Sequence, residues 1–121
     1  MWAVINKGTE LFRGVGIKSG RSLASAEVGS TCNDKAFQSY SLNPYVAKDF
    51  ANVWEDDDGK KHTTVIKAVS DGSQHAIYSN AHKPPEYEML LDKGTSWKIS
   101  GNKTYEQNGL VYHIVEVVPN A

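Results

Sequence analysis

Short apolar runs separated by Gly, Asn, Asp and Ser recur along the whole chain, and most of them are too short for helices. Residues 2–5 and 10–15 form the first two runs, with a predicted turn at Asn6-Lys7-Gly8 between them. Such runs, bounded by turn residues, are typical of strands. The N-terminal part therefore predicts two strands, whereas residues 16–36, rich in Gly, Ser, Ala and Asn, predict a long loop.

Alternation of apolar and polar residues over 36–42 predicts a further strand, with Ser39 and Ser41 on one face and Tyr40 on the other. Asn43 and Pro44 then provide an N-cap and a first helical residue. The apolar positions that follow have helical spacing and predict one apolar stripe: Val46, Phe50, Val53 and Trp54. On this pattern alone, Phe50 is a core residue.

Strand-like runs dominate the second half of the chain. Residues 62–69 and 76–78 predict strands, residues 89–91 and 96–99 a hairpin, and residues 110–118 a central strand. Residues 56–61 predict a solvated hairpin tip, because Trp54 and Val65 stand where a calcium loop needs acidic residues. We therefore expect an α+β, strand-dominated fold of two packed antiparallel sheets, or a split sheet, with a cleft between them.

Length, charge and composition limit the classes of protein to which the chain can belong. The chain has 121 residues, and we expect one domain spanning 1–121 with a core that needs no disulfide. Its net charge of −1 favours neither nucleic acid nor a membrane as a partner. No apolar run approaches transmembrane length, and we find no signal peptide. The histidines lack metal-site spacing, so no metal is expected, and Cys32 has no other cysteine to pair with.

Two carboxylates, Glu86 and Glu88, follow a pair of prolines and precede an apolar run. Residues i and i+2 of an extended backbone share a face, so the two are expected to project together where a buried strand begins. Paired carboxylates serve acid/base chemistry and stabilise sugar cations. Taken alone, however, the pair favours a solvated strand edge, because charged residues are mostly exposed.

Arg13 interrupts an otherwise apolar run, and a buried charge without a partner is costly. It is either part of a structural salt bridge or directed at an anionic ligand, which its bidentate guanidinium suits. Gly14 next to it lets the backbone approach such a ligand. A dinucleotide fingerprint starting at Gly14 is excluded, because its third glycine position is Ser19.

Three motifs stand in a fixed order along the chain: Leu11-Phe12-Arg13-Gly14-Val15, then Phe37-Gln38-Ser39-Tyr40-Ser41-Leu42-Asn43-Pro44, then Glu86-Tyr87-Glu88-Met89-Leu90-Leu91. Together they resemble the arginine–serine–glutamate class of mono-ADP-ribosyltransferases, which includes many bacterial toxins. The resemblance covers roughly residues 10–118. It implies a split β-sandwich with a central NAD cleft and few short helices.

For the co-substrate NAD, the resemblance assigns Arg13 to the phosphates and the Gly14 backbone to the nicotinamide amide. Phe50 would pack on the nicotinamide ring, and the two motif serines, Ser39 and Ser41, would lie at the cofactor. No metal is implied.

For catalysis, the resemblance assigns the NAD ribose to Glu88, with Ser39 orienting that carboxylate. Glu86 would face the acceptor, and a glutamate there goes with arginine as the acceptor in this class. Tyr40 departs from the usual central threonine, and we expect little effect because it faces away from the serines. Many relatives also carry a helical segment before the arginine strand, so the chain is either a minimal version or a trimmed one.

The resemblance implies a toxin or effector, secreted or delivered into a target cell and acting in its cytoplasm, with a cognate immunity protein filling the cleft. Two alternatives stay open. One is an NAD glycohydrolase, in which water replaces the protein acceptor. The other is a catalytically silent binding module with the same fold.

Overall fold

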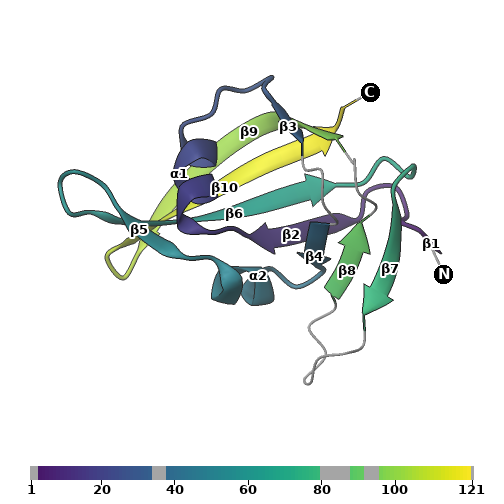
Figure 1. The fold of residues 1–121 in the computed structure, drawn as a ribbon, viewed down its shortest axis with the longest axis horizontal. Helices are drawn as coiled ribbons and strands as arrows, with labels where there is room; N and C mark the ends of the chain where they lie inside the picture. Colours follow the sequence, from purple (N-terminus) through teal and green to yellow (C-terminus); the bar gives the residue numbers. More distant parts are fainter. Residues whose placement is uncertain (1–2, 34–37, 80–87, 92–95, 121) are drawn as a thin grey trace.

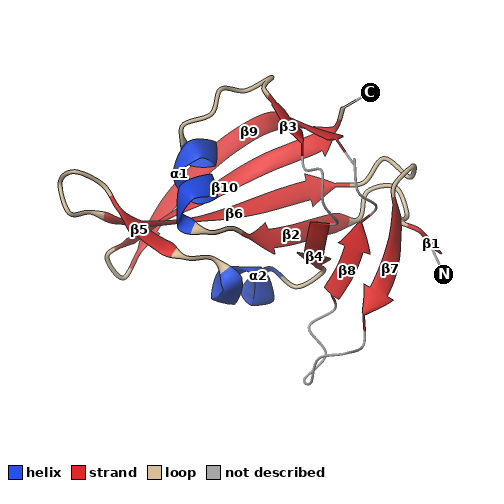
Figure 2. Ribbon diagram, viewed as in Figure 1, coloured by secondary structure: helices blue, strands red, loops and turns tan. Residues whose placement is uncertain are grey.

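The computed structural model describes residues 3–33, 38–79, 88–91 and 96–120. Strands dominate it, and two short helices lie against the sheet (Figures 1 and 2). The strands are β1 (Ala3–Val4), β2 (Glu10–Gly14), β3 (Thr31–Asn33), β4 (Gln38–Ser41), β5 (Val53–Glu55), β6 (Lys61–Val69), β7 (His75–Ser79), β8 (Glu88–Leu91), β9 (Ser96–Gln107) and β10 (Leu110–Pro119). The helices are α1 (Ile17–Ala24) and α2 (Pro44–Phe50). Neither helix is long and apolar enough to cross a membrane.

One mixed sheet contains all of these strands, in the order β1-β7-β8-β4-β2-β6-β10-β9-β3, and β5 pairs with β6. The pair β6–β10 is parallel. Tyr40 on β4 and Trp97 on β9 are separated by three strands, yet their ring centroids are 6.2 Å apart. In a flat sheet four strand spacings would separate them by about 19 Å. The sheet therefore curls until its arms face each other, and the prediction of two separate antiparallel sheets is not confirmed.

The core fills the inside of this curl and follows the alternation of the strands. Tyr40 is 3% exposed, as expected for the apolar face of β4. On the other face of the sheet, ion pairs join neighbouring strands, Lys67 to Glu10 at 2.7 Å and Lys103 to Glu116 at 3.4 Å. The buried core residues are Ile5, Leu11, Val15, Tyr40, Ile66, Ala68, Ala76, Leu91, Trp97, Ile99, Val115 and Val117.

The long loop predicted for residues 16–36 is wrong, because this segment contains α1 and β3. Tertiary packing overrides its weak helix propensity. Gly20 lies so close to β6 and β5 that a Cβ there would be 3.2 Å from Thr64 Oγ1 and 3.3 Å from Trp54 Nε1. The buried Thr64 hydroxyl donates a hydrogen bond to the Gly20 carbonyl at 3.0 Å. Gly20, which contributed to the loop prediction, is the residue through which α1 packs against the sheet.

The predicted hairpin of residues 89–91 and 96–99 is also wrong. β8 pairs with β7 and β4, whereas β9 pairs with β10 and β3. β9 continues through the polar stretch that follows and turns into β10 at Asn108-Gly109, where both residues have positive φ, 54° and 77°. Asn-Gly favours this tight hairpin turn. The turn residues, rather than the polarity of the strand, mark where it ends.

The start of α2 is confirmed as predicted. Asn43 caps the helix, its Oδ1 accepting a hydrogen bond from Tyr45 N at 2.9 Å, and Pro44 is the first helical residue. The predicted apolar stripe is wrong beyond the helix end, because Val53 and Trp54 belong to β5. Phe50 is 58% exposed and is therefore not a core residue.

Replacing the cap by Asn43→Ala should lower the free energy of unfolding by about 1 kcal/mol, because Tyr45 N loses its acceptor. The melting temperature should fall by roughly 4 °C. Thermal unfolding measures this change. Asn6→Ala, an exposed turn residue, is the control and should change stability by no more than about 0.5 kcal/mol. Equal effects of the two substitutions would contradict the capping role.

Candidate active site

The described parts of the three sequence motifs lie on three adjacent strands, although they are far apart along the chain. β4 pairs with β2 on one side and with β8 on the other (Figure 1). Phe12, Ser41 and Glu88 stand opposite one another in the ladder. Two strand spacings separate the outer members, about 10 Å between their backbones. The fold therefore gathers the arginine, serine and glutamate motifs within the reach of one ligand.

For some predicted site residues the structure gives the backbone only, or nothing. Ser39 is placed on β4, opposite Leu90, and Glu88 begins β8, and only their backbones are described. Glu86 lies outside the described residues. Their roles at NAD stay predictions.

Arg13 is partly buried at the end of β2 and lies beside Tyr40. Its guanidinium carbon is 6.0 Å from the centroid of the Tyr40 ring, a cation–π distance. The same ring belongs to the core, and its centroid is 6.2 Å from that of Trp97. A threonine at position 40 would offer no aromatic face, so Tyr40 supports Arg13 in a way that the sequence prediction missed. The clue available in the sequence was an aromatic residue replacing threonine between the two serines.

The backbone of α2 packs directly against Gly14. A Cβ at this position would lie 2.1 Å from Ala47 O, 2.5 Å from Ala51 N and 2.9 Å from Phe50 C, all of them backbone atoms. Only glycine permits so close an approach. The contact brings the end of α2 directly onto the end of β2. Phe50 is therefore held next to Arg13-Gly14 with its side chain largely exposed.

Ser41 joins β4 to α2. Its side chain is buried, and Oγ accepts a hydrogen bond from Asn43 N at 3.0 Å. Asn43 in turn caps the helix. The predicted NAD-site serine therefore also shapes the strand-to-helix connection, a role that the sequence did not reveal.

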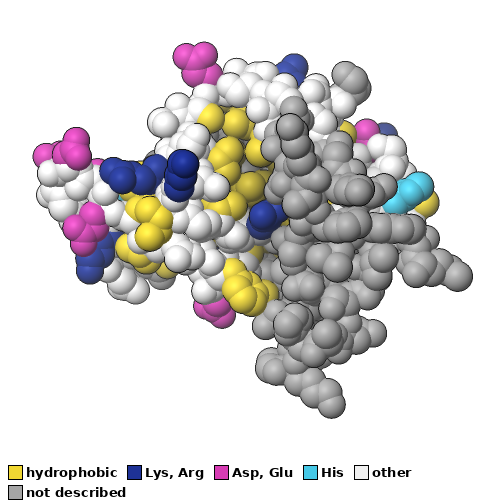
Figure 3. Space-filling model, in the orientation of Figure 1, with side chains coloured by type: hydrophobic (Ala, Val, Ile, Leu, Met, Phe, Trp, Pro, Cys, Tyr) yellow, Lys and Arg dark blue, Asp and Glu magenta, His cyan; other side chains and the backbone are white. Residues whose placement is uncertain are grey.

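Figure 3 shows hydrophobic side chains and a Lys or Arg side chain on the face of the sheet between α1 and α2. Among the residues that the structure describes, no group of three or more His, Cys, Asp and Glu side chains could hold a metal ion.

Comparison by sequence finds no matching family model and no matching curated protein. Comparison of folds finds bacterial ADP-ribosyltransferase toxins. The Vis toxin of Vibrio splendidus, an ADP-ribosyltransferase, matches with a TM-score of 0.58 and 25% identity over 93% of this chain and 49% of the toxin. Vis has also been solved in complex with agmatine.

Two further toxins match at lower identity. Plx2a of Paenibacillus larvae, an ADP-ribosyltransferase toxin, has a TM-score of 0.68 and 15% identity over 98% of this chain and 64% of the toxin. Exoenzyme S of Pseudomonas aeruginosa, solved with human 14-3-3 protein beta and bound to Carba-NAD, has a TM-score of 0.56 and 21% identity over 94% of this chain and 50% of that chain.

The fold of this chain is that of bacterial ADP-ribosyltransferase toxins, and the toxin-like resemblance predicted from the sequence is confirmed by these matches. The chain spans about half the length of Vis, 49%. The arginine–serine–glutamate assignment and the arginine acceptor are not tested by the comparisons.

Proposed function

We propose that this chain is an NAD-dependent mono-ADP-ribosyltransferase that transfers ADP-ribose to an arginine of a target protein and releases nicotinamide. The observation that carries the proposal is the placement of the described parts of the three motifs on the adjacent strands β2, β4 and β8. The matched fold supports it, and so does a neighbour solved with an NAD analogue.

The proposed reaction requires a group that stabilises positive charge at the ribose. Breaking the nicotinamide–ribose bond builds an oxocarbenium-like cation, as in glycoside cleavage. In the proposal, the Glu88 carboxylate stabilises this cation, and Ser39 orients the carboxylate. A fixed charge placed in this way stabilises the transition state more than the ground state.

In the proposal, residues at the end of β2 and at the end of α2 bind NAD, on the side of β4 away from β8. The Arg13 guanidinium would hold the phosphates in a bidentate contact. Exposed Phe50 would stack on the nicotinamide ring, since aromatic rings attract one another in offset geometry. The Gly14–α2 contact fixes the backbone that carries both residues.

Arginine as the acceptor rests on Glu86. A guanidinium is a poor nucleophile while protonated, and a nearby carboxylate can take its proton or hold it in line. The Vis complex with agmatine, which also bears a guanidinium, supports a guanidino acceptor. We further propose that the chain acts as a toxin or effector, secreted or delivered into the cytoplasm of a target cell, and that a cognate immunity protein covers the site.

The test is incubation with labelled NAD, using agmatine and a cell lysate as acceptors. The wild type should release nicotinamide and label a protein in the lysate. Glu86→Gln should lose transfer to agmatine and to protein, because the acceptor is no longer held or deprotonated, while it keeps part of the NAD hydrolysis. Transfer that survives in Glu86→Gln would contradict arginine selection by this residue.

The same assay separates the alternatives. An NAD glycohydrolase would release nicotinamide equally with and without acceptor and would label no protein. A silent binding module would turn over no NAD at all. Glu86 favours transfer over hydrolysis, because water needs no residue to hold a guanidinium.

A further inference from the structure

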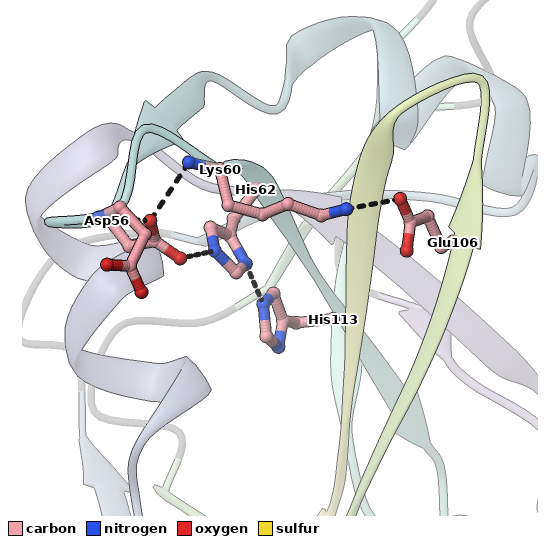
Figure 4. Close-up of polar contacts among 6 residues, drawn as sticks. Asp56, Lys60, His62, Glu106 and His113 are labelled. Atoms are coloured by element: carbon pink, nitrogen blue, oxygen red, sulfur yellow. Dashed lines mark hydrogen bonds and ion pairs between the residues drawn. The ribbon is translucent and has the colours of Figure 1, made fainter.

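A second group of titratable side chains lies away from the candidate active site, where the β5–β6 hairpin meets β10 (Figure 4). His62 on β6 is its centre. His62 Nε2 is 2.7 Å from Asp56 Oδ2, and His62 Nδ1 is 2.8 Å from His113 Nε2 on β10. The chain Asp56–His62–His113 therefore links the hairpin tip, β6 and β10. His113 is hydrogen-bonded at one ring nitrogen only, because its Nδ1 is buried without a partner among the described residues.

Aromatic stacking holds the same group together. The Trp54 ring of β5 stacks on His62 with centroids 4.3 Å apart and on His113 at 5.7 Å. The guanidinium carbon of Arg21 on α1 lies 5.7 Å from the Trp54 ring centroid. Trp54 is the direct cross-strand partner of His62, so the stack fixes β5 on β6.

The contact between the two imidazoles limits their charge. A hydrogen bond between His62 Nδ1 and His113 Nε2 needs an N–H on one side and a lone pair on the other. One added proton is tolerated, because His62 can donate to both Asp56 and His113. With two added protons, both facing nitrogens carry N–H groups and the bond cannot form. The arrangement is thus incompatible with a doubly protonated pair.

The charges around the two histidines also disfavour a second proton on the pair. Arg21 from α1 adds positive charge next to the stack, and Lys60 is paired with Glu106 of β9 rather than with the histidines. Among the described residues, Asp56 is the carboxylate that contacts the pair, and of the two imidazoles it contacts that of His62. Glu55 and Lys61 are exposed neighbours on β5 and β6, on the strand positions next to Trp54 and His62. A second proton on the pair would therefore lack a carboxylate partner among the residues that the structure describes.

We propose that Asp56, His62 and His113 form a proton-controlled latch that holds β5 against the sheet when at most one added proton is present and releases it when both imidazoles are protonated. β5 continues directly from α2 through Ala51 and Asn52, and Asn52 N donates to Val15 O at 3.1 Å. Opening of the latch therefore loosens the end of α2 that rests on Gly14. Acid pH would act on the candidate active site from a distance.

The pH range in which the latch weakens follows from the directions in which the pKa values of His113 and Asp56 are shifted. Burial, and then the charge of His62, lowers the pKa of His113 below its ordinary 6.5. The latch is therefore fully stable above about pH 6.5 and weakens as the pH falls from there through the folded-state pKa of His113. The hydrogen bond from His62 lowers the pKa of Asp56 below 3.8, so the Asp56 contribution is lost only at still lower pH.

The test is amide hydrogen exchange, expressed as protection factors at about pH 7.5 and about pH 5, on either side of where histidine ordinarily titrates. In the wild type, protection at residues 51–55 should fall on the order of tenfold at the lower pH relative to β2, the size expected for one lost hydrogen bond between buried groups. His113→Gln can still pair with His62 Nδ1 but does not titrate, so its protection should not change with pH. The exposed His75→Gln on β7 is the matched control and should behave as the wild type.

Equal loss of protection in the wild type and in His113→Gln would overturn the latch, and so would unchanged protection in the wild type. NMR titration of the imidazole signals gives a second measurement on the unmodified protein, in case His113→Gln does not fold. The His113 signals should titrate below the ordinary histidine pKa of 6.5, because burial and the charge of His62 lower the pKa of His113. A His113 that titrates as an exposed histidine does would contradict the proposal.

Discussion

Glu88→Gln should lose both transfer of ADP-ribose and hydrolysis of NAD, by roughly a hundredfold to a thousandfold in rate. Glutamine preserves the size of the side chain and removes the charge that would stabilise the ribosyl cation. The effect should appear in the turnover rate rather than in NAD binding, because the cation exists only in the transition state. Labelled NAD followed under single-turnover conditions measures it, with and without agmatine.

Glu27→Gln is the matched control for this experiment, because it neutralises an exposed carboxylate in a loop and should leave both rates unchanged. Glu86→Gln gives the contrast, since it should affect transfer alone. Full activity of Glu88→Gln would show that the reaction, if present, does not depend on the β8 glutamate. A melting temperature equal to that of the wild type would exclude unfolding as the cause of a lost rate.

The sequence predicted the motifs and the local start signals well, because these depend on neighbouring residues. Asn43-Pro44 opens α2 as expected, and alternation along β4 puts Tyr40 in the core. The resemblance to ADP-ribosyltransferase toxins rested on three motifs in a fixed order along the chain, which can be read without knowing how the strands pair.

Features that depend on tertiary contacts were missed. α1 contains a glycine and two serines, which weaken its helix propensity, and it is held by Gly20 against Thr64 and Trp54, a contact between residues far apart in sequence. The hairpin after β8 was predicted from adjacency, yet the sheet order places β8 between β4 and β7. The Asp56–His62–His113 chain was invisible for the same reason, because β6 and β10 pair in parallel and bring His62 and His113 together.

Phe50 was assigned to the core from its helical spacing alone, and the end of α2 shows why that was wrong. Its spacing from Val46 fits an apolar helical stripe, but α2 ends at Phe50 and the chain then enters β5. The helix is held by its backbone on Gly14 rather than by its last aromatic side chain. An apolar ring is thereby left exposed near the end of β2, where burial by a ligand would be favourable.

Gly14→Ala should be strongly destabilising, because a methyl group would overlap three backbone atoms of α2 and its end, at 2.1, 2.5 and 2.9 Å. Backbone atoms cannot move aside as the tip of a flexible side chain can. We expect a loss of about 3 kcal/mol or more in the free energy of unfolding, the upper part of the range for overpacking. The melting temperature should fall by roughly 10 °C. Chemical and thermal unfolding measure both quantities.

Gly16→Ala is the control, because a Cβ at Gly16 meets nothing within 4 Å and its φ of −71° suits any residue. It should change stability by less than about 1 kcal/mol. In Gly14→Ala, residue 14 keeps the backbone N–H and C=O that the resemblance assigns to the nicotinamide amide. A loss of NAD binding in folded Gly14→Ala would therefore arise from displacement of α2 and Phe50, not from a missing hydrogen-bonding group. A Gly14→Ala protein as stable as Gly16→Ala would mean that α2 does not rest on β2.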